Sequence, residues 1–403
     1  MNFTKIASVF VLTSLSLLAF GQPQDITDMQ FDCAQAQELS EDILSSQTLV
    51  AGCYRVTSAI EIDEGALLSI EAGSMLQFEE DAGLRIQDGA LSAIGDAENP
   101  IVFTSAANNP QAADWAGIHF TSNYPENILE HTIVAYAGDR RDAVMGTRTY
   151  AAVRVGGRAQ VSLRNSSFQH NDVRALLFDD GAQINDFSNN SFSANLGYPV
   201  QLESNQLGSL DTESDYAGED LAENDHNRID VRGGEVHDTQ TWLALNVPYE
   251  FNDRTFIVGS AEVTIDPGVR LYFGESNGIR VSDDASLSAV GTEDAPILFT
   301  GSSSFPNPGD WAGLHFSSNN PANTLEHSHV EYAGGRADNL MGTRTNAAVR
   351  VSNGGYLNLR NSRIAFSSEA GLKLDDDFTT LEPSDPSLDN SIVDNDVNIV
   401  DNR

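Results

Sequence analysis

The sequence predicts an all-β solenoid, a coil whose short strands return to the same positions on every turn. Two observations predict this fold. Segment 114–155 is written again at 310–351, 196 positions later, and the offset holds without a gap through DWAG, LEH, YAG, MGTRT and AAVRV. From residue 47 onward, short apolar alternations such as AIEI, MLQF, GLRI and PIVFTS recur between Gly, Asn and Asp. A period of two is typical of strands, and a strand order that repeats along the chain is typical of stacked turns.

The N-terminus has the pattern of a secretory signal peptide, which we place at residues 1–21. Lys5 precedes an apolar run at 6–20, and a small residue, Gly21, ends it. We therefore expect a secreted or periplasmic protein. No later stretch approaches the roughly 20 apolar residues of a membrane-spanning helix, so we expect no membrane span.

Residues 22–48 are predicted to form an N-terminal cap. The segment Cys33–Ser45 has helix-forming composition, and Leu39 and Ile43 follow helical spacing. It predicts a short amphipathic helix that covers the open edge of the first turn, since an uncovered sheet edge invites association. Cys33 and Cys53 are the only cysteines, and an even pair in an exported chain predicts a disulfide.

The rest of the chain divides into a first half of the coil at 49–206, an acidic loop at 207–227 and a second half at 228–403. Steps of about 23 residues for bare turns, and about 35 where loops are inserted, predict about 13 turns. The same turn pattern resumes after the acidic loop, so we expect one continuous coil. VSLRNSSF and LNLRNSRI place Asn165 and Asn361 at equivalent bends, and we expect Asn189 and Asn390 in the same row.

Several motifs carry a resemblance to a known class of proteins. They are ALLSIEAG and AEVTIDPG, LSAIG and LSAVG, PIVFT and PILFT, and DWAGIHF and DWAGLHF. With them the chain resembles the right-handed parallel β-helix proteins of the pectate-lyase-like class, and within it the secreted bacterial ones, over residues 50–400. The resemblance implies a right-handed parallel β-helix with an internal tandem duplication, and substrate clefts along the sheet that holds the GIHF-type tetrapeptides.

Cationic residues form a column on that sheet. In each tetrapeptide the flanking apolar residues must face the core, so the residue between them faces outward. Adjacent stacked cations repel by roughly 1 to 3 kcal/mol at a surface-like dielectric, so an anionic group is expected to offset them. The column contains Arg85, His119 and Arg154 in the first half, and Arg280, His315, Arg350 and Lys373 in the second.

Two sources of negative charge fit this column. The first is the protein's own carboxylates, among them Glu130, Asp142, Glu326 and Asp338. The second is an anionic ligand, most naturally a uronate or sulfated polysaccharide, because arginine grips planar carboxylates and sulfates with paired hydrogen bonds. The inserted loops also bring Arg140 and Arg336 near the column. The residues predicted to bind the ligand are Arg85, Arg154, Arg148, Arg280, Arg350, Arg344 and Lys373.

A polysaccharide lyase could use the same face. It would need a cation to neutralise the sugar carboxylate and a base to remove the neighbouring proton, and His119 and His315 are the candidate bases. A general acid at Tyr150 has no counterpart, because Asn346 stands at that position in the second half. No run of acidic residues indicates a calcium site and no cysteine or histidine spacing indicates another metal, so no cofactor is expected.

A glycoside hydrolase would instead need two carboxylates about 5 to 9 Å apart. The candidates shared by both halves are Asp114 with Glu130 and Asp310 with Glu326. Against this, Asp114 is expected to cap the turn before its neighbouring tryptophan.

Two further pairs of repeated residues are interpreted as structural. His131 and His327, in LEH, are expected to be core histidines. Trp115 and Trp311 enter a strand from a loop, which favours sealing of the core edge over stacking on sugar rings.

The charge balance excludes some partners. Asp and Glu number 59 against 22 Lys and Arg, a formal charge of −37, and such a field repels nucleic acid and anionic membranes. The leading hypothesis is a β-helix that binds anionic extracellular polysaccharide along a cationic ladder on one sheet. The alternatives are a lyase or hydrolase acting on the same face, and a structural or adhesin-like rod. Two copies of the site favour binding, since avidity profits from duplication. No feature indicates an oligomeric state.

Overall fold

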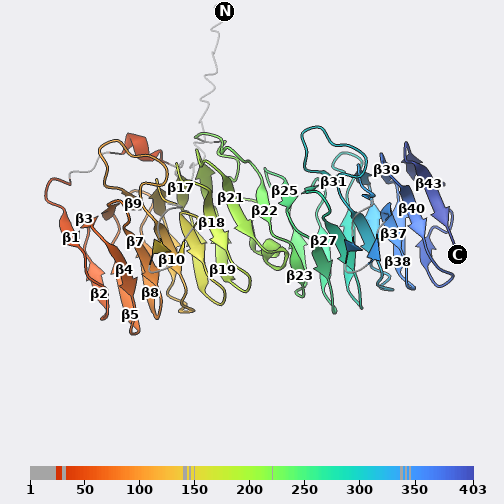
Figure 1. The fold of residues 1–403 in the computed structure, drawn as a ribbon. Helices are drawn as coiled ribbons and strands as arrows, with labels where there is room; N and C mark the ends of the chain where they lie inside the picture. The colour runs from red at the N-terminus through yellow and green to blue at the C-terminus, as the bar shows by residue number, and fades with distance from the viewer. Residues whose placement is uncertain are drawn as a thin grey trace, which may run out of the picture.

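The computed structural model describes residues 24–29, 33–138, 143–144, 147–148, 150–219, 221–335, 339–340, 343–344 and 346–403. In these residues the chain winds into a rod of stacked turns, from the β1 end to the β43 end (Figure 1). Every long sheet consists of parallel strands. The fold is a right-handed parallel β-helix, as predicted.

Three sheets form the sides of the first half. Sheet A contains β1 (Gln37–Leu39), β3 (Cys53–Val56), β6 (Met75–Phe78), β9 (Ile101–Ser105), β12 (Thr132–Ala135), β17 (Ser167–Gln169) and β20 (Ser191–Ser193). Sheet C contains β2 (Gln47–Leu49), β5 (Ala66–Ile70), β8 (Gly89–Ile94), β11 (Ile128–Glu130), β16 (Gln160–Arg164) and β19 (Gln183–Ser188).

Sheet B is the third side, and it continues through both halves with 13 strands among the described residues. Its strands are β4 (Ala59–Ile62), β7 (Gly83–Ile86), β10 (Gly117–Phe120), β15 (Val153–Val155), β18 (Arg174–Phe178), β21 (Tyr198–Leu202), β22 (Ile229–Val231), β25 (Tyr249–Phe251), β28 (Arg270–Phe273), β31 (Ile297–Gly301), β34 (Ser328–Glu331), β39 (Arg363–Ala365) and β42 (Ser391–Val393).

Two new sheets complete the second half. Sheet D contains β23 (Gly234–Val236), β26 (Thr255–Ile257), β29 (Gly278–Val281), β32 (Gly313–Phe316), β37 (Ala347–Val351), β40 (Ala370–Leu374) and β43 (Val397–Asp401). Sheet E contains β24 (Gln240–Trp242), β27 (Glu262–Ile265), β30 (Ser286–Val290), β33 (Thr324–Glu326), β38 (Tyr356–Arg360) and β41 (Thr380–Glu382).

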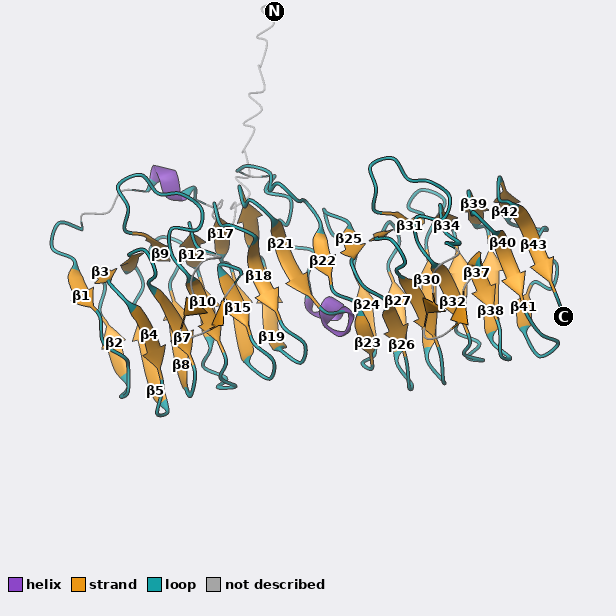
Figure 2. Cartoon of the chain, viewed as in Figure 1, coloured by secondary structure: helices purple, strands orange, loops and turns teal. Residues whose placement is uncertain are grey.

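The second half is rotated by one face relative to the first. The GIHF strand β10 lies in sheet B, whereas its repeat GLHF, β32, lies in sheet D. Each turn runs from sheet B to sheet C in the first half and from sheet B to sheet D in the second, so sheet D continues the face of sheet C. The 3-10 helix η2 (Ser204–Ser209) lies at the junction, against β19, β23 and β24 (Figure 2). The repeated segments are therefore separated by a number of turns that is not whole, and equivalent strands face different directions.

The core of the coil is one continuous column of apolar side chains. Trp115 is fully buried and stacks on Phe78 with ring centroids 4.0 Å apart. Trp311 is also fully buried and stacks on Phe273 at 4.3 Å. Each indole N–H donates to a backbone carbonyl. The prediction that both tryptophans seal the core is confirmed.

The acidic segment between the halves also contributes to this core. Leu210 is 2 % exposed and Tyr216 is fully buried. The ring of Tyr216 stacks on Phe192 at 5.5 Å and on Phe187 at 6.3 Å. A composition that is acidic and poor in strands therefore still contains a turn of the coil, because a few apolar residues point inward.

The bends between sheets contain left-handed residues. Asn165 and Asn189 have φ of 50° and 53°, and the Asn189 amide donates to Asn165 Oδ1 at 2.7 Å. Asn361 has the same backbone conformation, with φ of 48°. Asn390 does not belong to this row; its Oδ1 accepts from the backbone N–H of Ser362 instead. Asn390 therefore corresponds to Asn190, which forms the same bond with Ser166, and not to Asn189 as expected.

His131 and His327 are bend residues too, with φ of 48° and 45°, and both side chains are partly exposed. The prediction that they are core histidines was wrong. In the LEH motif the leucine, Leu129 or Leu325, is the buried residue, and the chain turns immediately after the glutamate. The histidine therefore points away from the core.

The predicted helix at Cys33–Ser45 was wrong as well. A turn at 34–35 leads into β1, which pairs in parallel with β3, and Ile43 forms a bridge with Ile62. Pairing with the open edge of the first turn outweighs the helical spacing of a few apolar residues. The Cys33–Cys53 disulfide is confirmed. The 3-10 helix η1 (Ile26–Asp28) is the ordered element before it.

No helix in the described part of the chain is long and apolar enough to cross a membrane. The predicted signal peptide at 1–21 lies outside the described residues.

Candidate functional site

The predicted cationic columns exist as two ladders. The first ladder is Arg85, His119 and Arg154, which are register partners on β7, β10 and β15. The second ladder joins β29, β32, β37 and β40 in the same way. Its members are Arg280, His315, Arg350 and Lys373.

The two ladders lie on different sheets. The first is on sheet B and the second on sheet D, which occupies the next face of the coil. The expectation of a ladder on one sheet was therefore wrong for the molecule as a whole. One straight polymer chain cannot lie along both ladders, because they face different directions.

The histidines at the centre of each ladder are buried although their strand positions face outward. His119 is 3 % exposed and His315 is fully buried. Two short hairpins lie in the inserted loops: β13 (Ala143–Val144) pairs with β14 (Thr147–Arg148), and β35 (Asn339–Leu340) pairs with β36 (Thr343–Arg344). Strand β13 lies close to β7, and β35 lies close to β29.

Burial and the flanking cations keep both imidazoles neutral. Burial, followed by the charges of the Arg154 and Arg85 guanidinium groups, lowers the pKa of His119 to about 4. Burial lowers the pKa of His315 to about 3, with the charge of Arg350 as the next cause. A base with so low a pKa holds a proton weakly near neutral pH. This environment gives little support to a lyase that uses either histidine as its base.

The first ladder is neutralised by carboxylates of the protein. Glu61 precedes Arg85 in the column and accepts a hydrogen bond from it at 3.3 Å. Asp179 accepts two from Arg154, at 2.9 and 2.8 Å. Glu61 and Asp179 were not among the carboxylates named from the sequence, of which Asp142 lies outside the described residues. Glu130 instead pairs with Arg164 on sheet C at 2.7 Å.

The second ladder has a different set of partners. Asp375 accepts from both Arg350 and Lys373, the latter at 3.3 Å. Arg280 donates from Nε to the Ser317 hydroxyl at 3.2 Å. Asp142 and Asp338, two further carboxylates proposed as partners, lie outside the described residues, as do Arg140 and Arg336. Arg148 and Arg344 lie in the hairpin strands, where only the backbone is described.

The ends of the two ladders differ in charge. Phe256 precedes Arg280 where Glu61 precedes Arg85, and Lys373 follows Arg350 where Leu177 follows Arg154. The exchanges remove one negative charge and add one positive charge. The inserted loops do not cancel this difference, because each carries a formal charge of +1, from three Arg and two Asp in 139–150 and two Arg and one Asp in 335–346.

An open depression adjoins the start of the second ladder. Arg280 lies in it beside Ser282, and its floor includes Val258 and Gly259. The ring of Phe256, one strand away in the column, is partly exposed. The acidic residues Glu235 and Asp283 and the imidazole of His237 complete the rim. An aromatic ring and a guanidinium therefore lie side by side at the surface.

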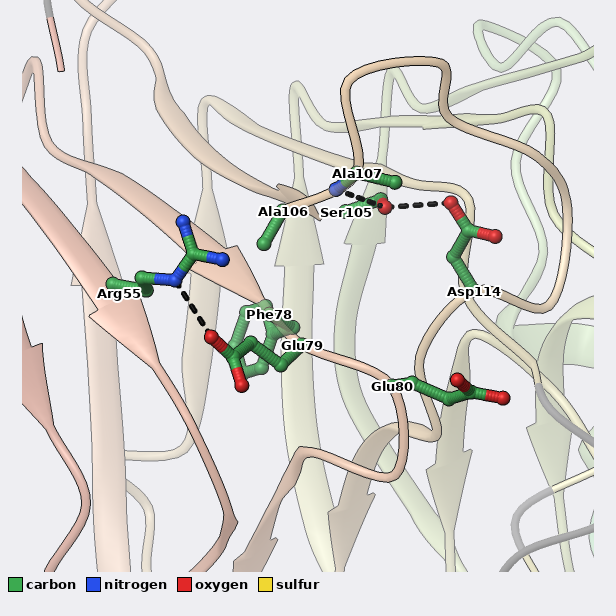
Figure 3. A pocket seen from close by; sticks show the side chains of 8 residues that line it. All are labelled: Arg55, Phe78, Glu79, Glu80, Ser105, Ala106, Ala107 and Asp114. Atoms are coloured by element: carbon green, nitrogen blue, oxygen red, sulfur yellow. Dashed lines mark hydrogen bonds and ion pairs between the residues drawn. The ribbon is translucent and has the colours of Figure 1, made fainter. Parts of the chain in front are cut away.

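The carboxylates proposed for a hydrolase are not brought together. Asp114 accepts from the Ser105 hydroxyl at 2.6 Å and from the Gln111 N–H at 2.9 Å, and so fixes the loop before β10 (Figure 3). Glu130 lies on sheet C, where it is paired with Arg164. In the second half, Asp310 likewise accepts from a loop N–H, that of Asn307, at 2.8 Å. The prediction that Asp114 caps the turn is confirmed.

A cluster of buried charges on sheet B was not found from the sequence. Asp230 and Glu250 are register partners on β22 and β25, and they are 3 % and 8 % exposed. Arg174 lies 3.5 Å from Asp230, and Arg228 lies 2.9 Å from Glu250. Tyr198 donates to Glu250 at 3.1 Å.

Burial raises the pKa of Tyr198 to about 12, and the charges of Glu250 and Asp230 are further causes. The cluster is therefore largely shielded from solvent. The charges balance within the cluster, which fits a role in joining the two halves. A signal was present in the sequence: an acidic residue at the centre of IDV and of YEF, where the ladders have cations.

Among the residues that the structure describes, no group of three or more His, Cys, Asp and Glu is placed to hold a metal ion. What the described site offers to a ligand is positive charge, hydrogen-bond donors and one aromatic ring.

These features define a parallel β-helix protein with charged ladders on its outer faces. The chain belongs to the family of pectate-lyase like beta helix domains, which it matches at residues 41–164 and 234–343, more than half of its length. The family confirms the β-helix class that the sequence motifs indicated. No curated protein and no solved structure matched the chain in the same comparisons.

Proposed function

We propose that the protein binds an anionic polysaccharide through its second half, along the second ladder on sheet D. The observation that carries this proposal is the exchange of Glu61 for Phe256 and of Leu177 for Lys373 between the two ladders. In the first ladder, the charges of Arg85 and Arg154 are neutralised by Glu61 and Asp179, so no anionic ligand is required to offset them. The second ladder is more positive by two charges and begins with the partly exposed ring of Phe256.

The chemistry of these residues suits a uronate or a sulfated sugar. Guanidinium groups such as those of Arg280 and Arg350 meet planar carboxylates or sulfates with paired hydrogen bonds, whereas the ammonium of Lys373 acts as a point charge. The ring of Phe256 offers an apolar face against which a sugar ring can pack. The family description names pectate lyases, and pectate is itself an acidic polysaccharide.

The binding is proposed to take place outside the cell. The disulfide and the predicted signal peptide both support an oxidising compartment. The role is non-catalytic in this proposal, since the candidate bases His119 and His315 are buried with pKa values near 4 and 3.

The test is a binding assay on immobilised pectate, alginate, chondroitin sulfate and a sulfated galactan. The double variant Phe256→Glu with Lys373→Leu should bind about tenfold more weakly or worse, since each contact to a charged group contributes roughly 1 to 2 kcal/mol. The matched control, Arg85→Gln with Arg154→Gln, removes two charges from the first ladder. It should bind within about twofold of the native protein.

Equal losses in both variants would show that overall charge, not the second ladder, governs binding, and would overturn the proposal. So would an absence of binding to all four polymers. The same samples should be followed for absorbance of unsaturated products, because their release would identify a lyase instead.

A further inference from the structure

The N-terminal segment Gln24–Met29 docks on the outer face of sheet A, far from its own place in the sequence. The backbone N–H of Ile26 donates to Oε1 of Gln169 at 2.9 Å, and Nε2 of Gln169 donates to the carbonyl of Gln24 at 2.7 Å. Gln169 is itself fully buried, and its Nε2 also lies 2.7 Å from the hydroxyl of Ser167. The side chain of Gln169 therefore forms hydrogen bonds with both an N–H group and a carbonyl group of the docked backbone.

Apolar contacts extend this docking across several turns. Ile26 is 8 % exposed and packs in one cluster with Met75, Val102 and Ile133, which come from β6, β9 and β12. Met29 packs against the same cluster, together with the two cysteines. These side chains form a small second core on the outside of the coil, separate from the main core.

The disulfide fixes the other end of this segment. Cys33 follows it closely in the chain and is bonded to Cys53, the first residue of β3. Gln169 is the last residue of β17. The segment is thus held at β3 and at β17, the first and last of the five neighbouring strands β3, β6, β9, β12 and β17.

The second half has no equivalent docking face. The positions that match Met75, Val102, Ile133 and Gln169 are, in that order, Arg270, Leu298, His329 and Ala365. Two of the four, Arg270 and His329, are charged or titratable. Ala365 has no side-chain amide that could form hydrogen bonds with a docked backbone. Among the described residues, no other segment is tied in this way across successive turns.

We infer that residues 24–29, with the disulfide, form a clamp that makes the five turns containing β3, β6, β9, β12 and β17 open as one unit. In a solenoid each turn contacts only its neighbours, so turns normally open one at a time from an end. A clamp that joins the turn of β3 to the turn of β17 removes this independence, because β3 cannot separate without also releasing Ile26 and Gln169. The second half, without a clamp, opens turn by turn from β43.

The test is hydrogen exchange of the full exported chain, followed by mass spectrometry. Ile26→Asp places a charge in the apolar contact. It should raise exchange together in β3, β6, β9, β12 and β17, by about tenfold or more, with no change in sheets D and E. Gln24→Asp adds the same charge at an exposed position of the segment, where the docking contact is made by the backbone carbonyl, and should leave these strands unchanged. Reduction of the disulfide in the native protein should affect the same five strands.

A milder variant, Gln169→Leu, has a side chain of similar size and removes the two hydrogen bonds to the docked segment. It replaces Ile26→Asp in the experiment if that variant does not fold. It should give a smaller but still joint rise in the five strands. A rise confined to residues 24–29 would overturn the clamp, as would a rise in β3 that does not reach β17. An equal rise in the second half would also overturn it, since the effect would then be general.

Discussion

The two ladders share their centres and differ at their ends. Both have an arginine, a buried histidine and an arginine in register. At one end, Glu61 of the first ladder is matched by Phe256 of the second, and at the other, Leu177 is matched by Lys373. The repeated centre is therefore a feature shared by both halves of the coil, whereas the proposed ligand site rests on residues that are not repeated.

The rotation of the second half has a consequence for binding. Duplicated sites raise avidity when one polymer chain reaches both. Here the ladders face different directions, on sheets B and D, so a stiff chain on one cannot continue along the other. The proposed binding therefore assigns the ligand to the second ladder alone, because in the first ladder Arg85 and Arg154 are paired with Glu61 and Asp179.

The largest expected effect is a loss of stability in mild acid, from the shared centres. The unfolded chain protonates each histidine below about pH 6.5, whereas folded His119 and His315 stay neutral down to about pH 4 and 3. Their folded pKa values are lowered, so the stability they contribute is complete above pH 6.5 and falls as the pH decreases. At pH 5 each should cost about 2 kcal/mol relative to pH 7.

The measurement is the free energy of local opening of β10 and β32, from hydrogen exchange at pH 7 and pH 5. His119→Gln and His315→Gln cannot titrate, so each should remove about 2 kcal/mol of the pH dependence in its own strand. The carboxylates titrate in native and variant proteins alike, and the difference between them isolates the histidine. A pH dependence as large in both variants as in the native protein would contradict the buried neutral state.

An intermediate effect is expected when the ends of the first ladder are exchanged for those of the second. Glu61→Phe with Leu177→Lys should create a second site, so that the number of glycan chains bound per protein doubles. Its affinity should lie within roughly tenfold of the native site, since each exchanged charge contributes about 1 kcal/mol. Titration calorimetry reports the stoichiometry, with Glu61→Gln as the control that removes charge without adding a ring or a cation.

An unchanged stoichiometry, in a protein whose native site still binds, would mean that the ends do not decide binding. The comparison between the ladders would then be a comparison of two structural features.

The fold could be predicted because its signal is repeated many times. Alternation with a period of two, bends at Asn165 and Asn361, and the 196-residue offset all report the same coil, so single errors average out. The helix expected at Cys33–Ser45 failed for the opposite reason. It depended on a few apolar residues in one place, and the open edge of the coil at β3 offered them a strand partner.

The site could be predicted only in part. The register that aligns Arg85, His119 and Arg154 follows from the strand pattern, but their surroundings do not. The strand pattern places His119 and His315 at outward positions, yet they are 3 % and 0 % exposed. The change of face depends on counting turns through a segment where Tyr216 is one of few inward residues. The exchange of Glu61 for Phe256 can be found in the segments AIEI and TFI, which lie one turn before Arg85 and Arg280. Finding it requires an alignment of these two segments with each other.

The smallest expected effect concerns one hydroxyl beside each buried histidine. Nε2 of His315 lies 2.7 Å from the hydroxyl of Ser352, which is 2 % exposed. The equivalent residue beside His119 is Gly156, where an added Cβ would lie 3.4 Å from Nε2 and 3.3 Å from the carbonyl oxygen of Phe120. Gly156 does not have a left-handed φ, so a serine meets no backbone strain there.

Gly156→Ser should therefore form the missing hydrogen bond and stabilise β10 by about 1 kcal/mol, while Ser352→Gly should cost β32 about 1 to 2 kcal/mol. Local opening measured by hydrogen exchange reports both, and Gly156→Ala separates the two physical causes, because it fills the same space without a hydroxyl. If alanine stabilises β10 as much as serine does, then packing and not the hydrogen bond distinguishes the two centres.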